Sequence, residues 1–247
     1  MSDAASVTTR ARAIVDEARQ RGQDALTERE GLALFAEFGV PVPGARLVAD
    51  RDELAAAVSA LRFPIVCKVE SPNIVHKSDV GGVQLGCTSL EDVEGAFDAI
   101  LAAVGEAVPD AHIAGVLLAE QVDGMAECFV GAHIDAEFGP VVGFGLGGIF
   151  VEVLNDLAWR AAPFDANEAR RMIDDTLAVG VLAGFRGKPA ADVDALADAI
   201  AAVSVLVWEL RDDVSELDVN PILVGPVGAG VVAVDSFIKL AAPATGD

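Results

Sequence analysis

The pattern of apolar and polar residues along this chain predicts a mixed α+β fold with helices and strands in irregular order. Apolar positions recur at helical spacing in segments that begin after Thr27, after Asp50 or Asp52 and after Ser89, and over 165–179 and 190–210. Short runs rich in Val, Ile and Leu predict strands at 63–70, 83–88, 115–121, 127–134, 140–145, 215–224 and 231–238. Two of the helices carry capping-box signals, Thr27 with Glu30 and Asp165 with Glu168.

Composition and charge narrow the classes of function. The 247 residues are 53% hydrophobic and 23% charged, which indicates a globular chain, and no apolar run approaches the roughly 18 residues of a membrane span. A formal charge of −22 argues against nucleic-acid binding, because a phosphate backbone would be repelled. The N-terminus has no apolar signal core, and the three cysteines form no CxxC pair. We therefore expect a cytoplasmic protein with reduced thiols.

Candidate chemistry is concentrated between residues 68 and 82. The chain has only four lysines and three histidines, and Lys68, His76 and Lys77 fall within ten residues, just before Gly81-Gly82. A cation, an imidazole and exposed backbone N–H groups together are suited to handling a phosphate. Each feature also has a plainer interpretation: an exposed strand lysine, a structural loop histidine, a tight turn. Their order, strand lysine, histidine loop, glycine pair and strand, favours the phosphate site.

The last two predicted strands suggest a metal site. Glu216, Asp218 and Asn220 alternate with apolar residues and so share one face of a strand. A hairpin that is symmetric about the connection 225–230 pairs Asn220 with Asp235, and opposed residues lie roughly 5 Å apart at Cβ. Oxygen ligands of this kind suit Mg²⁺ that bridges to phosphates. A solvated polar face is the alternative, and a shift of one residue in register would remove the pairing.

A competing motif is Gly143-Phe-Gly145-Leu-Gly-Gly148, which matches the dinucleotide-binding pattern G-x-G-x-x-G. That function also needs a helix that opens at the glycines and an acidic residue about 20 residues further on, at the end of the next strand. Neither is predicted, because 149–154 favours β structure as much as helix. A dinucleotide-binding oxidoreductase therefore remains a minor alternative.

Taken together, the motifs resemble the ATP-grasp subunit of the ADP-forming acyl-CoA synthetases, the acetate–CoA ligase type, and more distantly the succinyl-CoA synthetase β subunit. The resemblance covers about residues 26–240. It rests on separated segments in a fixed order: Phe63–Lys68, Ser71–Asp79, Gly81–Val83, Phe138–Pro140, Phe144–Gly148, Arg186–Gly187, Glu216–Pro221 and Val232–Asp235.

The resemblance implies an ATP-grasp fold, with ATP or ADP and Mg²⁺ in a cleft between two α+β subdomains. Residues 1–25 are charged and rich in arginine, and they predict an N-terminal helical extension or linker outside the resemblance. The expected subdomains cover 26–118 and 119–242, and a polar tail covers 243–247. The residues that match nucleotide contacts are Lys68, Gly81, Gly82, Val83, the hinge Glu120, Gln121 and Val122, and Glu127. Those that match Mg²⁺ ligands are Asn220 and Asp235, with Asp218 beside them. His76 matches the family's phosphate-carrying histidine.

Two departures from the family pattern qualify this interpretation. Gln121 stands where the family more often has methionine. The sequence also lacks the CoA-binding and ligase domains that carry the family's other phosphohistidine, so the resemblance implies a separate partner subunit in a hetero-oligomer. A catalytically silent nucleotide-sensing module remains an alternative, although His76, Lys68, Asn220 and Asp235 are all intact.

Overall fold

The computed structural model describes residues 2–74, 76–148, 156–184 and 189–242, and it divides into two compact units. Unit 1 contains residues 1–42 and 123–247, and unit 2 contains residues 43–122. The chain therefore passes between the units twice, at Val42–Pro43 and at Val122–Asp123. Both units combine helices with sheet, which confirms the predicted α+β class. No described helix is long and apolar enough to cross a membrane.

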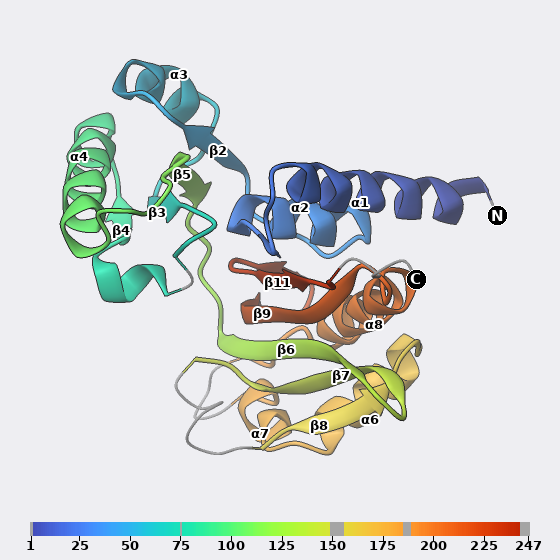
Figure 1. Ribbon diagram of the computed structural model, residues 1–247. Helices are drawn as coiled ribbons and strands as arrows, with labels where there is room; N and C mark the ends of the chain where they lie inside the picture. The colour runs from blue at the N-terminus through green and yellow to red at the C-terminus, as the bar shows by residue number, and fades with distance from the viewer. Residues whose placement is uncertain (1, 75, 149–155, 185–188, 243–247) are drawn as a thin grey trace, which may run out of the picture. The chain divides into compact units, whose positions relative to one another are not determined.

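Unit 1 is built on an antiparallel sheet that has seven strands among the described residues (Figure 1). Six of them follow the order β1-β11-β9-β6-β7-β8, and β10 also pairs with β9. The strands are β1 Ala25–Leu26, β6 Ala126–Asp135, β7 Gly139–Leu146, β8 Ala158–Ala161, β9 Val214–Val224, β10 Val231–Ala233 and β11 Phe237–Leu240. The helices among the described residues of the unit are α1 Ser2–Gln20, α2 Glu28–Glu37, α6 Ala166–Asp174, α7 Ala178–Leu182 and α8 Val193–Glu209.

The core of unit 1 lies between the sheet and its helices. In β6 the even-numbered residues Cys128, Val130 and Ala132 are buried in the same cluster as Leu196 and Ile200 of α8. Because side chains alternate along a strand, the odd-numbered residues of β6 face the other side of the sheet. That side also carries Asp218 of β9, which pairs with Gly131 of β6, so this candidate metal ligand lies on the face opposite α8.

The segment before residue 43 belongs to unit 1 and is not a separate extension. Ala11, Val15 and Ala18 of α1 are fully buried in the core of unit 1, and Leu26 pairs with Ile238 of β11. The predicted domain division therefore differs from the observed units: residues 1–42 pack with the C-terminal part of the chain. The predicted boundary at 118/119 lies four residues before the observed crossing at 122/123. The predicted tail, 243–247, lies outside the described residues.

Unit 2 is a four-stranded antiparallel sheet in the order β2-β5-β3-β4, with helices packed against it. The strands are β2 Ala45–Val48, β3 Ile65–Glu70, β4 Val83–Cys87 and β5 Gly115–Glu120. The helices are the 3₁₀ turns η1 Arg51–Glu53 and η2 Lys77–Val80, and the α-helices α3 Leu54–Ser59 and α4 Leu90–Ala107. All six residues of β3 are buried. β3, one of the two inner strands, is therefore buried along its whole length.

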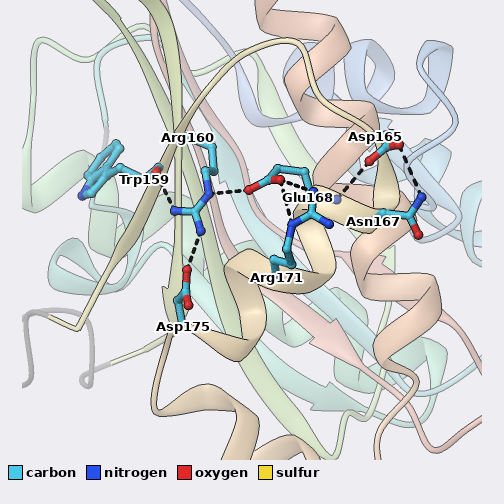
Figure 2. Close-up of polar contacts among 7 residues, drawn as sticks. All are labelled: Trp159, Arg160, Asp165, Asn167, Glu168, Arg171 and Asp175. Carbon is cyan, nitrogen blue, oxygen red and sulfur yellow. Dashed lines mark hydrogen bonds and ion pairs between the residues drawn. The ribbon is translucent and has the colours of Figure 1, made fainter.

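The predicted helix over 165–179 is shorter than expected. Asp165 caps α6 by accepting a hydrogen bond from Glu168 N, but α6 ends at Asp174 and a separate helix, α7, follows. Figure 2 shows that the Glu168 carboxylate points toward two arginines and not back to the cap. It accepts from Arg160 Nε at 2.7 Å and from Arg171 Nε at 2.9 Å. This network connects β8 to α6, so the reciprocal half of the predicted capping box does not form.

Candidate active site

The hairpin at the end of the chain has the predicted register. Ala233 of β10 pairs with Ile222, and Phe237 of β11 pairs with Asp218, and both pairs are symmetric about the same point of the connection. Residues 234–236 interrupt the pairing between these two ladders, and Asp235 lies in that interruption at the level of Asn220. The Asp235 carboxylate accepts from Ser236 N at 2.8 Å. The structure therefore confirms the register on which the pairing of Asn220 with Asp235 was predicted.

Asn220 lies next to a glycine turn that follows β7. Its Oδ1 accepts from Gly148 N at 3.1 Å. Gly148 also lies against Glu127, because a Cβ added to it would stand 3.0 Å from Glu127 Oε2. The structure thus brings together Asn220 and Glu127, which were predicted separately, and adds Gly148 between them. The glycine motif contained Gly148, but its contact with Asn220 spans 72 residues of sequence and gave no local signal.

Asp218 is partly buried on the same face as Asn220. It lies opposite Gly131, where a Cβ would stand only 2.7 Å from Asp218 Oδ1. Burial, together with a smaller contribution from the nearby charge of Glu216, raises the pKa of Asp218 to about 6. Within the described part of the chain neither carboxylate forms an ion pair.

The donor set fits a hard divalent cation. Asp218, Asn220 and Asp235 offer carboxylate and amide oxygens, the ligands that Mg²⁺ prefers in proteins. Among the described residues, no three His, Cys, Asp or Glu side chains gather as a group that could hold a metal. The predicted set contains only two such side chains, Asp218 and Asp235, because its third member, Asn220, is an amide. The assignment of these three residues to Mg²⁺ stays a prediction.

In unit 2, the candidate phosphate residues lie at one end of the β3–β4 pair. Lys68 is 9% exposed, and it pairs with Val83, the first residue of β4. Just before Val83, Gly82 donates to Lys77 O at 2.8 Å and accepts from Val69 N at 2.8 Å. A Cβ on Gly82 would lie 2.6 Å from Val69 Cγ1, so only glycine fits this close approach. Strand lysine and glycine loop are therefore adjacent, as predicted.

His76 is exposed and stands directly before η2. The 3₁₀ turn ends at Val80 and is capped by Gly81, whose φ of 70° lies in the left-handed region that favours glycine. On the other side of His76, Asn73 anchors the loop, because its Oδ1 accepts from His112 N at 2.9 Å. The histidine is thus presented to solvent on a loop that is attached to the fold at Asn73 and at the glycine pair.

The predicted hinge, Glu120–Val122, ends where the chain crosses from unit 2 to unit 1. The Glu120 carboxylate is bound to Arg62: it accepts from Arg62 N at 3.0 Å and from Nη2 at 2.7 Å, and these bonds lower the pKa of Glu120. The side chain is thus engaged in a structural ion pair. Sequence analysis missed Arg62, because the pairing depends on the contact between β5 and the segment before β3.

The glycines of the G-x-G-x-x-G motif have structural roles. Gly143 and Gly145 lie inside β7 and not in a loop after a strand. Cβ atoms there would collide with the Trp159 ring and with Asp156 O, respectively. β7 pairs on both sides with antiparallel strands, so the parallel strand-helix-strand unit of a dinucleotide site is not formed around these glycines. Residues 149–155, where the required helix would begin, lie outside the described residues.

Comparison with known families identifies the family of the chain. A family model described as an ATP-grasp domain matches residues 17–240. The chain belongs to the ATP-grasp family. Two curated ATP-grasp relatives from Pyrococcus furiosus, the β subunits of acetate–CoA ligase (ADP-forming) II and I, are each 37% identical to it. They cover 92% and 94% of this chain, which in turn spans 96% and 98% of theirs. The chain spans only 33% of a longer relative, the 4-hydroxybutyrate–CoA ligase (ADP-forming) of Nitrosopumilus maritimus.

Solved structures give the same ATP-grasp fold. The dinucleotide forming acetyl-coenzyme A synthetase 1 of Ca. Korarchaeum cryptofilum, in complex with coenzyme A, Ca-AMPCP and HgCl⁺, aligns with a TM-score of 0.90 at 36% identity. The alignment covers 94% of this chain and all of that chain. A second structure of that enzyme, with coenzyme A and Mg-AMPPCP, has its phosphohistidine segment pointing towards the nucleotide binding site. It aligns with a TM-score of 0.81 at 32% identity, over 94% of this chain.

Proposed function

We propose that this chain is the nucleotide-binding subunit of an ADP-forming acid–thiol ligase. The overall reaction converts acyl-CoA, ADP and phosphate into a carboxylic acid, CoA and ATP. Relatives that match this chain almost end to end are β subunits of such ligases. The observation that carries the proposal is the position of His76, exposed on the loop that joins the lysine strand β3 to the Gly81–Gly82 turn.

The residues of unit 2 carry the proposed phosphoryl transfer. Lys68 and the N–H groups of the glycine loop bind the phosphates, and the neutral His76 imidazole attacks the γ-phosphorus of ATP in line, with ADP as the leaving group. The reverse step returns the phosphoryl group from His76 to ADP. The other residues form no covalent bond with the phosphate. They contribute by positioning the triphosphate for attack and by neutralising its charge. The imidazole must be unprotonated to accept the group.

In unit 1, Asp218, Asn220 and Asp235 would hold Mg²⁺, which neutralises phosphate charge when bound. The assignment predicts that Asn220→Ala raises the Mg²⁺ concentration needed for half-maximal ATP binding, because an oxygen ligand is removed. Asn167→Ala, on α6, is the matched control and should titrate like the wild type. Equal Mg²⁺ requirements for Asn220→Ala and the wild type would remove Asn220 from the ligand set.

The proposed partner is a separate CoA-binding subunit that forms the acyl phosphate and passes its phosphoryl group to His76. Two relatives are named β subunits, which implies an α subunit in those enzymes, and a third relative is about three times longer than the segment that matches this chain. The test is ATP formation from ADP and phosphate, driven by acyl-CoA, by this chain co-expressed with such a subunit. Tight Mg²⁺-dependent ATP binding without turnover would favour the nucleotide-sensing alternative.

A further inference from the structure

Gln121, in the hinge segment, reaches across unit 2 to the strand that follows the glycine loop. β3 lies between β5 and β4 in the sheet, and Gln121 follows β5 directly. Its backbone N donates to Pro64 O at 2.8 Å, at the entrance to β3, and its side-chain Oε1 accepts from Gly86 N at 2.8 Å, on β4. One residue thus connects the hinge to both neighbouring strands.

The Gly86 N–H is available because the β3–β4 ladder is irregular at this point. Ile65 pairs with Cys87, whereas Cys67 pairs with Gln84, so β4 carries an extra residue between the two pairs. Gly86 has a φ of 73°, the left-handed conformation typical of such irregularities. Its N–H is a donor and needs an oxygen, which fixes the orientation of the Gln121 amide. A methionine at this position would offer only a weak thioether acceptor.

β4 is therefore attached at both of its ends. At its beginning, Gly82 O accepts from Val69 N of β3, and near its end Gly86 N donates to the hinge residue Gln121. The glycine loop is thereby linked to the hinge through a short strand that is fixed at two points. A site that is rigid before the ligand arrives loses less conformational freedom on binding.

We propose that Gln121 is a positioning residue for the nucleotide, holding β4 and its glycine loop in a fixed place relative to the hinge. This inference rests on the proposed function, because it assigns the hinge and the loop to the same nucleotide. Gln121 acts through Gly86, and the hydrogen bond between them is the element that the test must remove and restore.

The test uses two substitutions at Gln121 and one matched control. Gln121→Met keeps the length of the side chain and removes the acceptor, whereas Gln121→Glu keeps an acceptor for Gly86 N and loses the amide donors. Gln84→Met makes the same chemical change on β4, where the Gln84 side chain donates to Leu85 O at 3.2 Å and to no other residue that the structure describes. The dissociation constant for ADP·Mg²⁺ is measured by calorimetry on the full chain at about 0.3 M salt, which screens the charge of the glutamate. Hydrogen exchange of the β4 amides is measured on the same samples.

We expect Gln121→Met to weaken ADP binding by roughly two- to tenfold, the range of one net hydrogen bond, and to speed exchange at β4. Gln121→Glu should restore both properties, and Gln84→Met should match the wild type. Unchanged binding and exchange in Gln121→Met would overturn the inference. Weak binding by Gln121→Glu with intact β4 protection would also overturn it, since the amide would then contact the nucleotide itself. Failure of the wild type to bind ADP would refute the proposed function and the inference together.

Discussion

Asp192 should stabilise unit 1 by joining the start of α8 to the hairpin that carries the candidate metal ligands. Its Oδ1 accepts from Ala195 N at 3.2 Å and caps α8. Its Oδ2 accepts from Gly228 N at 2.8 Å and from Gly230 N at 2.9 Å, both in the connection between β9 and β10. Asp192→Ala removes all three bonds at once.

The expected loss follows from these contacts. A missing N-cap costs about 1 kcal/mol. Each of the two hydrogen bonds from Gly228 N and Gly230 N adds roughly 0.5–1.5 kcal/mol. We use this range, and not the higher one for bonds to charged groups, because the turn is open to water. We therefore expect Asp192→Ala to lower the free energy of unfolding by about 2–4 kcal/mol, a large part of the ~5–15 kcal/mol of a typical domain. Asp192→Asn keeps one acceptor oxygen and should lose about half as much.

The effect should depend on pH in a defined direction. Hydrogen bonds, first from Gly230 and then from Ala195 and Gly228, lower the pKa of Asp192 below its ordinary value. The folded state thus favours the charged carboxylate, and the stabilisation is complete above the unfolded pKa of about 4. It is lost as the pH falls through the lower, folded value. The gap in stability between the wild type and Asp192→Ala should therefore narrow below about pH 4.

Urea unfolding followed by tryptophan fluorescence measures this directly, because both tryptophans, Trp159 and Trp208, belong to unit 1. Asp194→Ala is the matched control: the side chain is 92% exposed and pairs with Arg170 on the surface. It should unfold close to the wild type. An Asp192→Ala variant as stable as Asp194→Ala at pH 7, or a gap that stays constant from pH 7 to pH 3, would refute the reasoning.

Two further predictions concern the glycine loop and the thiols. Gly82→Ala should destabilise unit 2 and weaken ATP binding, because its Cβ would stand 2.6 Å from Val69 Cγ1. Gly105→Ala, in open space within α4, should stabilise the protein by about 0.5–1 kcal/mol, and thermal unfolding compares the two. All three cysteines should resist a thiol reagent at pH 8 until the protein is unfolded, since burial raises the pKa of each, that of Cys128 to about 12. Rapid labelling of the native protein would contradict the described burial.

Local sequence patterns predicted the hairpin register well, since the glycine-rich connection fixes its centre and the alternation of β9 fixes its faces. The break in strand pairing at 234–236 was not predicted, although Pro221 on the opposite strand indicated a weak point in the ladder. Proline has no N–H for the ladder, so regular pairing opposite Asn220–Pro221 is weakened. The capping box of Thr27 and Glu30 was also predicted correctly from sequence. Both of its hydrogen bonds form between residues only three positions apart, so no distant contact is needed.

Features that depend on distant contacts could not be predicted from local patterns. The helix after Asp165 stops at Asp174, and the next helix opens where Asp156 accepts from Leu177 N at 2.6 Å. The N-terminal helices were recognised, but their assignment to unit 1 depends on β1 pairing with β11. The bonds of Gln121 to Gly86 and of Asp192 to Gly228 likewise join segments 35 and 36 residues apart.

Phosphoryl transfer to His76 is the most direct test of the central claim. The purified chain, together with the proposed CoA-binding subunit, is incubated with ATP·Mg²⁺ labelled at the γ-phosphate, and acid-labile phosphate is located by peptide mapping. We predict label on the peptide that contains His76, its return to ATP when ADP is added, and its absence in His76→Asn, which should still bind ATP. His112→Asn is the matched control and should retain the label. Transfer or turnover at the wild-type rate in His76→Asn would contradict the account.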